Sequence, residues 1–221
     1  GDINGDGIPD IAMGAANSDR FATDAGAVYL VHGVDSTSGG SFAGGTVENA
    51  DTILTGSSLY DAAGLALAPA GDQDGDGYDD FLVGAQGANT VYVVQGSASG
   101  ITDGELASAS LATITPTLST GLHVTAGGGD VNNDGQPDIL VGAYSNNSNT
   151  GTAYLFTGPL SGTLTESDAA GTFEGVNQNS KAGVSLSFAG DVNQTSTGDG
   201  LLIGASGSGS DEVYLMLSIG Q

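Results

Sequence analysis

The feature that most limits how this chain can fold is a short acidic loop that recurs along it. Residues 72–80 read DQDGDGYDD and run directly into the apolar segment FLVGA. Oxygen-bearing groups stand at alternate positions of this loop, and glycine occupies positions where the chain must turn sharply. Without a counter-charge the carboxylates would repel one another, because like charges at short range disfavour ionisation. The spacing therefore indicates a loop that wraps a hard cation.

Further copies of this loop have the same order of residue types. Residues 2–10 read DINGDGIPD and residues 130–138 read DVNNDGQPD, and each is followed by an apolar segment ending in Gly-Ala. A fourth, altered copy starts at Asp191, so the starts of successive loops are 58 to 70 residues apart. Periods of this size are typical of propellers and similar arrays, in which each unit is one small sheet.

Ca²⁺ is the cation that best suits this set of oxygens. It takes six to eight oxygen ligands at about 2.3–2.6 Å, from carboxylates and from carbonyl groups. An EF-hand is the nearest alternative, but it requires flanking helices and a Glu at the twelfth loop position. The corresponding residues here are Met13, Val83 and Val141, which lie in apolar segments. The sequence therefore excludes an EF-hand and predicts calcium loops of another kind.

Each repeat unit contains short stretches with strand character. They recur in the same order, at residues 11–14, 27–31, 52–55, 64–70, 81–84, 91–94, 111–115, 121–126, 139–142, 153–156, 171–176, 183–189, 201–204 and 213–216. The apolar spacing of two and the frequent Gly and Ser mean that no helix signal competes. Many of these strands are apolar on both faces, so we expect them to be covered on both sides.

Four strands per unit is the geometry of a propeller blade. We therefore expect an all-β propeller of four-stranded blades, in one region with repeat units at about residues 1–62, 63–119, 120–181 and 182–221. No strand precedes the first loop and none follows Leu217. Because open sheet edges invite pairing, we expect part of a larger ring, with further blades from missing sequence or from a partner chain. A permuted ring of four blades is the alternative.

The combination of loop, apolar strand, Gly-Ala and period resembles the FG-GAP repeats of the integrin α-subunit β-propeller, over essentially the whole chain. The chain departs from that family at residues 63–64, 120–121 and 182–183, where the family usually has Phe-Gly, and it lacks the Pro of Gly-Ala-Pro. The resemblance implies a seven-bladed ring, with Ca²⁺ in hairpin loops on one face and ligands bound on the opposite face.

The resemblance also implies the metal ligands of the three intact loops. Four side chains and one backbone carbonyl are expected to bind each ion: Asp2, Asn4, Asp6 and Asp10 with the carbonyl of Ile8; Asp72, Asp74, Asp76 and Asp80 with that of Tyr78; and Asp130, Asn132, Asp134 and Asp138 with that of Gln136. We therefore expect about three Ca²⁺ per chain, with a structural role.

The fourth loop, at residues 191–199, departs from the other three. It keeps Asp191 and Asn193 but has Thr195 and Ser196 where the others have Asp and Gly, and it carries one extra residue before its strand. A weak fourth site would use Asp191, Asn193, Thr195 and Asp199. The altered pattern favours an ion-free, hydrogen-bonded turn instead.

The charge balance limits the partners of the chain. It has 26 acidic residues and only two basic ones, Arg20 and Lys181, for a net charge of -24. This balance argues against nucleic acids and anionic membranes as partners. Thirteen of the acids lie within the four loops, so cations are the expected counter-charge. No apolar run approaches the roughly 18 residues of a membrane span. The chain starts inside a loop and carries no signal peptide, so we expect it to be part of a longer protein.

Catalytic motifs are missing from the sequence. It has no cysteine, no Gly-x-Ser-x-Gly and no Gly-x-x-x-x-Gly-Lys, which excludes the common nucleophile and phosphate-binding motifs. We expect a non-enzymatic module of a secreted or cell-surface protein, for adhesion or for recognition of a protein or glycan. The alternatives are a carbohydrate-binding propeller, which the lack of Trp disfavours, and an accessory domain of a secreted hydrolase.

Other recurring or isolated residues have structural interpretations. We expect the tyrosines at equivalent strand positions to form part of the framework: Tyr29, Tyr92, Tyr154 and Tyr214. The glycine of each Gly-Ala is expected to permit close backbone approach. His32 and His123 are expected to be ordinary strand-end or loop residues. Arg20 and Lys181 are expected to be surface cations near acidic groups.

Overall fold

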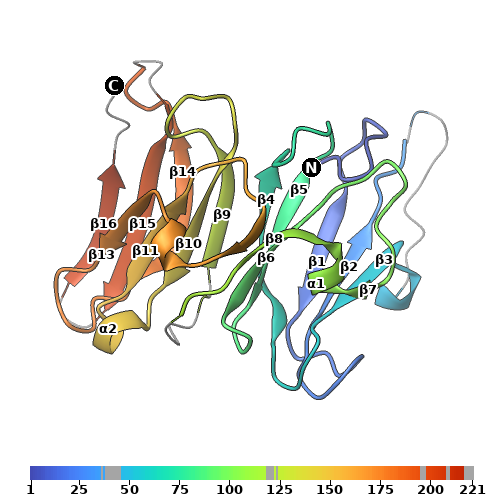
Figure 1. Cartoon of the computed structure of the whole chain (residues 1–221), viewed down its shortest axis with the longest axis horizontal. Helices are drawn as coiled ribbons and strands as arrows, with labels where there is room; N and C mark the ends of the chain where they lie inside the picture. Colours follow the sequence, from blue (N-terminus) through green and yellow to red (C-terminus); the bar gives the residue numbers. More distant parts are fainter. Residues whose placement is uncertain are drawn as a thin grey trace.

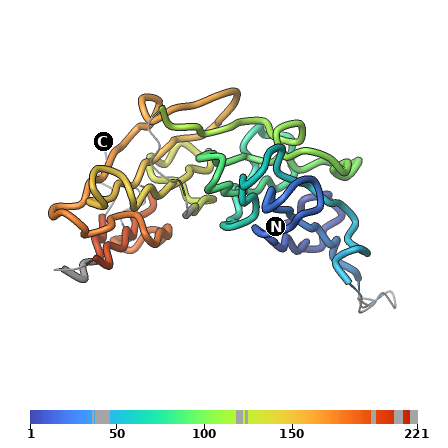
Figure 2. The backbone as a smooth tube through the Cα atoms, turned by 90° about the horizontal axis from the view of Figure 1, so that it is seen from below, coloured from blue at the N-terminus to red at the C-terminus, as the bar shows by residue number. Residues whose placement is uncertain are grey.

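The computed structural model describes residues 1–35, 37, 46–117, 122, 124–194, 198–207 and 210–216. Strands dominate these residues and form four sheets, each of three to five strands. Figure 2 shows the sheets following one another along an arc, from the N-terminal to the C-terminal end of the chain. The first and last sheets lie at opposite ends of the molecule (Figure 1).

The four sheets are numbered in the order in which they follow one another along the chain. The first contains β1 (Ile11–Ala15), β2 (Ala27–Val31), β3 (Thr52–Thr55) and β7 (Gly104–Glu105); the second contains β4 (Ala63–Gly71), β5 (Asp80–Ala85), β6 (Thr90–Val94), β8 (Ser110–Ile114) and β12 (Gly162–Leu164). The third contains β9 (Val124–Gly129), β10 (Asp138–Ala143), β11 (Thr152–Phe156) and β13 (Gly171–Glu174), and the fourth contains β14 (Ala182–Gly190), β15 (Gly200–Gly207) and β16 (Ser210–Met216).

The helices in the described part of the chain are short. They are α1 (Leu106–Ala109) and α2 (Asn146–Asn149), with 3₁₀ turns η2 (Val47–Asn49) and η3 (Glu166–Asp168). None of them is long or apolar enough to cross a membrane, among the residues described. The mostly β architecture therefore agrees with the alternating pattern of the sequence.

The sheets do not all have the four strands expected for each unit. Two short strands, β7 and β12, leave their own repeat unit and pair in parallel with β3 and β8 of the preceding one. They contain only two and three residues, too few for an apolar alternation to be visible in the sequence. Each of these strands ties a sheet to the unit that follows it in the chain.

The core lies between neighbouring sheets. Val28 and Leu54 of the first sheet pack with Val94 of the second, and a second cluster joins Leu82 of the second sheet to Phe156 of the third. Strands β5 and β10 are buried along their whole length. The expectation that apolar strands are covered on both faces is therefore confirmed for these inner sheets.

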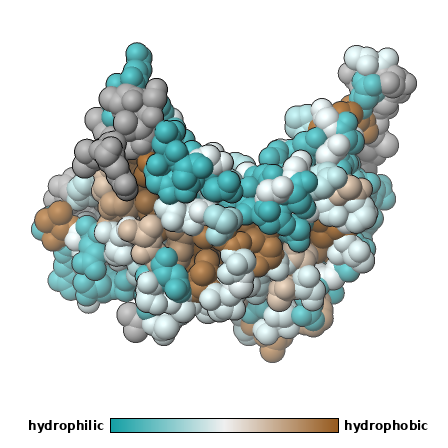
Figure 3. All heavy atoms as spheres, turned by 45° about the horizontal axis from the view of Figure 1, so that its top comes forward, coloured by the Kyte–Doolittle hydropathy of each residue, from teal (hydrophilic) through white to brown (hydrophobic). Residues whose placement is uncertain are grey.

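That expectation is wrong for β1 and β16 of the two end sheets, although β2 of the first sheet is buried except at Val31. Ile11 and Met13 of β1 are 46% and 37% exposed, and Val213 of β16 is 72% exposed. The residues of β5 and β10 that correspond to Ile11 and Met13 are buried, because those strands pack against a neighbouring sheet on each side. Figure 3 shows apolar groups reaching the surface among hydrophilic residues on one face of the molecule.

The recurring tyrosines and glycines have the framework roles expected of them. Tyr29, Tyr92 and Tyr154 are 5–7% exposed, and Tyr214 is half-buried. A Cβ atom on Gly14 would lie 2.0 Å from the carbonyl oxygen of Gly64 in the next sheet. Such a contact is far shorter than van der Waals separation, so only glycine permits this approach between strands.

The two cations lie near partners at the surface. The Arg20 guanidinium forms an ion pair of 2.7 Å with Glu48, as expected for a surface cation near an acid. The Lys181 ammonium lies 5.9 Å from the centre of the Tyr144 ring, at a cation–π distance. His123, expected to be a strand-end or loop residue, lies outside the described residues, as do Thr195 and Ser196 of the fourth loop.

Candidate metal centre

The three intact acidic loops occupy equivalent places in the fold. The second loop (residues 72–80) joins β4 to β5, the third (residues 130–138) joins β9 to β10, and the first (residues 2–10) leads into β1. All three lie along the upper edge of the sheets in Figure 1. The strand registers pair Gly71 with Asp80 and Gly129 with Asp138, so the hairpins close at the same position.

The leading aspartate of each loop shapes the turn through its carboxylate. Asp72 Oδ1 accepts a hydrogen bond from the Asp76 N–H at 3.0 Å, and Oδ2 accepts one from the Gly77 N–H at 2.9 Å. Asp2 and Asp130 accept the equivalent bonds at 2.8 to 3.1 Å. Gly77 has φ of 92°, a left-handed conformation that explains the glycine at this position. The local sequence thus folds all three loops in the same way.

The last aspartate of each loop, here called the closing aspartate, ties the loop to a neighbouring strand. Asp80 Oδ2 accepts from the Gln73 N–H at 2.8 Å, and Oδ1 accepts from the Gly96 N–H at 2.7 Å. Asp10 and Asp138 accept the equivalent pairs of bonds, at 2.7 to 3.0 Å. The closing aspartates therefore join the start of each loop to the end of the following hairpin strand.

The closing aspartates of the second and third loops are also buried. Burial raises the pKa of Asp80 to about 6. The hydrogen bonds from the N–H groups of Gly96 and Gln73 lower this pKa, whereas the negative charges of Asp74 and Asp76 raise it further. Burial likewise raises the pKa of Asp138. In the absence of an ion, the second loop thus holds a carboxylate whose charged form is disfavoured.

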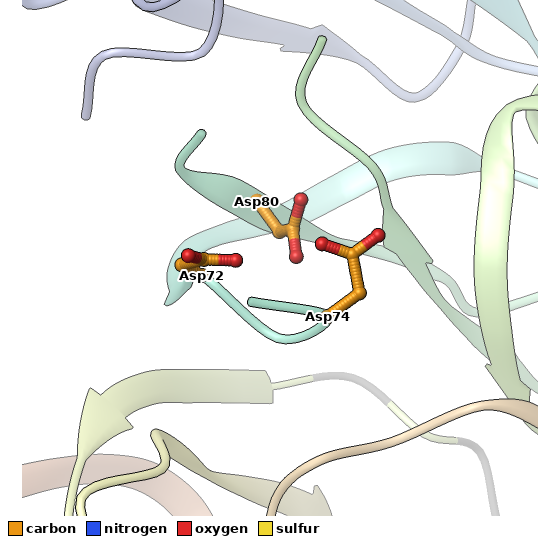
Figure 4. A group of neighbouring side chains, drawn as sticks. All are labelled: Asp72, Asp74 and Asp80. Atoms are coloured by element: carbon orange, nitrogen blue, oxygen red, sulfur yellow. The ribbon is translucent and has the colours of Figure 1, made fainter. Parts of the chain in front are cut away.

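The second loop brings three carboxylates together. Asp72, Asp74 and Asp80 each place one oxygen within 4.8 Å of the others, and no other three His, Asp or Glu side chains in the described part of the chain meet as closely. Figure 4 shows the three carboxylates facing a common space inside the loop. Ligand oxygens around one Ca²⁺ ion lie at most roughly 5 Å apart. The donor set therefore fits a hard cation.

The remaining expected ligands lie around this group. The Asp76 carboxylate accepts from the Tyr78 N–H at 3.0 Å, which fixes the residue whose carbonyl is the expected backbone ligand. The N–H groups of Ile8 and Gln136 donate to Asp6 and Asp134 at 2.8 Å. The three carbonyl positions are thus equivalent in the fold.

The first and third loops differ from the second at the second of the expected side-chain ligands. There Asn4 and Asn132 replace the aspartate, and their amide N–H₂ groups donate to Asp6 and Asp134 at 3.1 and 2.8 Å. Their amide oxygens accept from the backbone N–H of the same aspartates. Asparagine thus lowers the negative charge of these loops while it keeps an oxygen in place.

The fourth loop lacks a closing aspartate. The strand register pairs Gly190 with Gly200, which places Gly200 where the second and third loops have Asp80 and Asp138. Asp199 therefore stands one position earlier, and its carboxylate accepts a hydrogen bond from the Asp130 N–H of the third loop at 3.0 Å. The extra residue in the sequence has shifted this acid out of the expected ligand position.

Two residues beside the loops were not predicted as part of the sites. Gln95 follows β6, and its Nε2 donates to the carboxylates of Asp74 and Asp76. His32 holds the equivalent place after β2, with Nδ1 3.4 Å from Asp10 Oδ1. Both residues immediately precede the glycine that donates to the closing aspartate, which is the signal by which the sequence could have revealed them.

Comparison with known proteins agrees with these features. A family model described as FG-GAP repeat matches residues 1–31, and one described as FG-GAP-like repeat matches residues 72–141. Integrin alpha-IIb of Homo sapiens is 35% identical over 162 residues, which cover 66% of this chain and 14% of that protein. Integrin alpha-PS2 of Drosophila melanogaster is 32% identical over 161 residues, which cover 65% of this chain and 11% of that protein.

The same relationship extends to other animals. Integrin alpha pat-2 of Caenorhabditis briggsae is 33% identical over 181 residues, which cover 72% of this chain and 14% of that protein. The chain thus spans between about a tenth and a seventh of the length of these relatives. With its recurring acidic hairpins and matching family models, the chain is an FG-GAP repeat protein, distantly related to integrin alpha subunits.

Proposed function

We propose that this chain is a non-enzymatic module in which each intact acidic loop binds one Ca²⁺ ion of structural importance. The observation that carries this proposal is the convergence of Asp72, Asp74 and Asp80 to within 4.8 Å. The other two intact loops repeat the hydrogen-bond frame of the second loop. A bound ion supplies the positive charge that offsets the repulsion among the loop carboxylates.

The residues of each loop hold the ligand oxygens in place before an ion arrives. The leading and closing aspartates are fixed by backbone N–H groups at both ends of the turn. Such preorganisation lowers the entropy lost on binding. The ion then connects the two ends of a hairpin, which stabilises the edge of the sheet rather than a reacting group.

We further propose that the module serves adhesion or protein recognition outside the cell, as a piece of a larger ring. The relatives named integrin support this role. Exposed apolar residues also stand at the strand ends opposite the acidic loops: Phe21, Leu59 and Tyr60 are 53%, 61% and 62% exposed. Exposed aromatic side chains of this kind are common anchors in protein interfaces.

A carbohydrate ligand and an accessory role in a secreted hydrolase are the alternatives. Phe21 and Tyr60 give the first of these some support, because aromatic rings offer apolar faces to sugars. A glycan array distinguishes a carbohydrate ligand from a protein ligand. Nucleic acids and direct membrane insertion are not part of the proposal, given the net charge of -24.

Isothermal titration calorimetry tests the metal assignment. The wild-type chain should bind about three Ca²⁺ ions at up to millimolar concentrations, in the range of extracellular modules. Asp76→Ala should reduce the number by one. Glu174→Ala, which removes an exposed acid of β13 outside the loops, is the matched control and should leave the number unchanged. A stoichiometry near zero for the wild-type chain would overturn the proposal.

A further inference from the structure

The first and second loops are joined by direct hydrogen bonds between them. The Asp2 N–H donates to Asp79 Oδ2 at 2.8 Å, and the Asp79 N–H donates back to the Asp2 carbonyl at 3.1 Å. The Ser97 N–H adds a bond of 2.9 Å to the Ile3 carbonyl. Two backbone donors and one carboxylate of the second repeat unit thus hold the first loop.

The same joint cannot form between the second and third loops. Pro137 stands where the second loop has Asp79, immediately before the closing aspartate, and Pro159 stands where the second unit has Ser97. Proline has no N–H to donate, and Pro137 has no carboxylate. Both backbone donors and the side-chain acceptor of the first joint are therefore absent from this one.

Gln73 supplies a different connection at that place. Its side chain is fully buried, and its Nε2 donates to the Pro137 carbonyl at 2.8 Å and to the Ala70 carbonyl at 3.0 Å. The first and third loops have the apolar residues Ile3 and Val131 at this position. A buried amide is costly unless it is hydrogen-bonded. The two carbonyls satisfy the N–H₂ group of Gln73, whereas its buried Oε1 accepts no hydrogen bond from the described residues, so the bond to the carbonyl of the next loop is what this glutamine contributes here.

The position of Gln73 links the closing aspartates of both loops. Its own N–H donates to Asp80 Oδ2 at 2.8 Å, and its side chain holds the carbonyl of Pro137, the residue directly before Asp138. A cation that fixes Asp80 thereby also fixes the Gln73 backbone. Because the Gln73 side chain is hydrogen-bonded to the Pro137 carbonyl, the backbone next to Asp138 is then restricted as well.

We propose that Gln73 couples the second and third loops, so that Ca²⁺ in either loop raises the affinity of the other. This inference rests on the calcium binding proposed above. The ordering of one loop reduces the conformational entropy that its neighbour loses on binding, which gives positive cooperativity without a large change of structure. By linkage the effect is the same in both directions.

A double-mutant experiment tests this coupling. Asp76→Ala disables the second loop, and Gln73→Met removes the amide but keeps an unbranched side chain of similar length. Calcium affinity of the third loop is measured by NMR in all four combinations, with the Gly135 N–H, which donates to Asp130, as the reporter. Asp76→Ala should weaken the third loop about fivefold when residue 73 is Gln, and should leave it unchanged when residue 73 is Met.

Two controls separate this coupling from general damage. Gln95→Met removes an amide that donates to Asp74 and Asp76 within the second loop, so the fivefold effect on the third loop should persist. The first loop is held by Asp79 and Ser97 rather than by Gln73. Its calcium affinity, followed by the NMR signal of the Gly7 N–H, should therefore respond to Asp76→Ala equally with Gln or Met at residue 73. If the Gln73→Met spectrum is not that of a folded chain, Gln73→Val, which copies the third loop, replaces it.

The possible outcomes also distinguish the coupling from the proposed function. The coupling is overturned if Asp76→Ala weakens the third loop equally with Gln and with Met at residue 73, or if it does not weaken the third loop when residue 73 is Gln. Calcium binding stands in both cases. A wild-type chain whose Gly7, Gly77 and Gly135 signals do not respond to millimolar Ca²⁺ overturns both. Loss of affinity only in the presence of Gln73 supports the coupling.

Discussion

The carboxylate of Asp199 accepts a hydrogen bond from the Asp130 N–H at 3.0 Å, and the Asp199 N–H donates to the Asp130 carbonyl at 2.7 Å. Asp79 and Asp2 form the same pair of bonds at 2.8 and 3.1 Å. In both cases an aspartate directly before the closing position joins its own loop to the preceding one. The expected ligand of a fourth metal site thus contributes to a joint between loops.

This joint predicts a difference between two substitutions of Asp199. Asp199→Ala leaves the Asp130 N–H without its carboxylate partner and should lower the free energy of unfolding by about 1 kcal/mol. Asp199→Asn keeps an acceptor oxygen and should cost much less. Urea unfolding of both variants measures the difference. Equal losses in the two variants would argue against the hydrogen bond as the source of stability.

Removal of calcium should destabilise the whole chain. A site at 100 times its dissociation constant adds about 2.7 kcal/mol to the apparent stability, and 1 kcal/mol changes the melting temperature of a domain of this size by roughly 2–4 °C. We therefore expect a chelator to lower the melting temperature by at least about 5 °C, as measured by calorimetry. Re-addition of Ca²⁺ should restore it. An unchanged melt would show that bound ions do not support the fold.

Calcium binding to the second loop should weaken in mild acid. Burial raises the pKa of Asp80 to about 6, so in the ion-free folded state protons compete with Ca²⁺ for this carboxylate below that pH. Affinity should be about tenfold lower at pH 5 than at pH 7, because only about a tenth of a group with this pKa is ionised at pH 5. NMR titrations followed at Gly77 measure it, with Asp80→Asn as the control that lacks the titrating group.

The same pKa shift predicts the sign of the pH dependence of stability in chelator. The folded state holds a proton on Asp80 at pH values where the unfolded state has lost it, between roughly 4 and 6. The contribution of Asp80 to the free energy of unfolding therefore falls as the pH rises through this window. Urea unfolding at pH 4.5 and pH 6.5, compared with Asp80→Asn, isolates that contribution. A contribution that rises with pH would contradict the effect of burial.

The close approach of neighbouring sheets predicts a strong effect of one methyl group. A Cβ atom on Gly142 would lie 2.1 Å from the Gly183 carbonyl oxygen, whereas one on Gly84 would meet the Ala66 Cβ at 3.2 Å. Gly142→Ala should therefore cost more than about 2 kcal/mol, and Gly84→Ala should cost clearly less. Chemical denaturation of the two variants measures both. Similar losses would mean that the sheets move apart without penalty.

The sequence by itself determined the parts of this protein that depend on short-range chemistry. The turn around Asp72 is made by hydrogen bonds to residues up to five positions away, so the loop could be recognised from the local sequence. The alternating or continuous apolar runs placed β5 and β10 correctly, because strand formation and burial follow the same pattern there. The metal ligands and the ion number predicted from the resemblance stay predictions.

Only the tertiary structure decided which distant residues meet. It buried Asp80 at the start of β5, which raises the pKa of that carboxyl; it left Ile11 exposed on an end sheet; and it placed Asp199 beside Asp130, 69 residues away. The role of Gln73 likewise depends on a carbonyl 64 residues along the chain. Contacts of this kind arise from the packing of whole sheets against one another, so they cannot be inferred from a local pattern of residues.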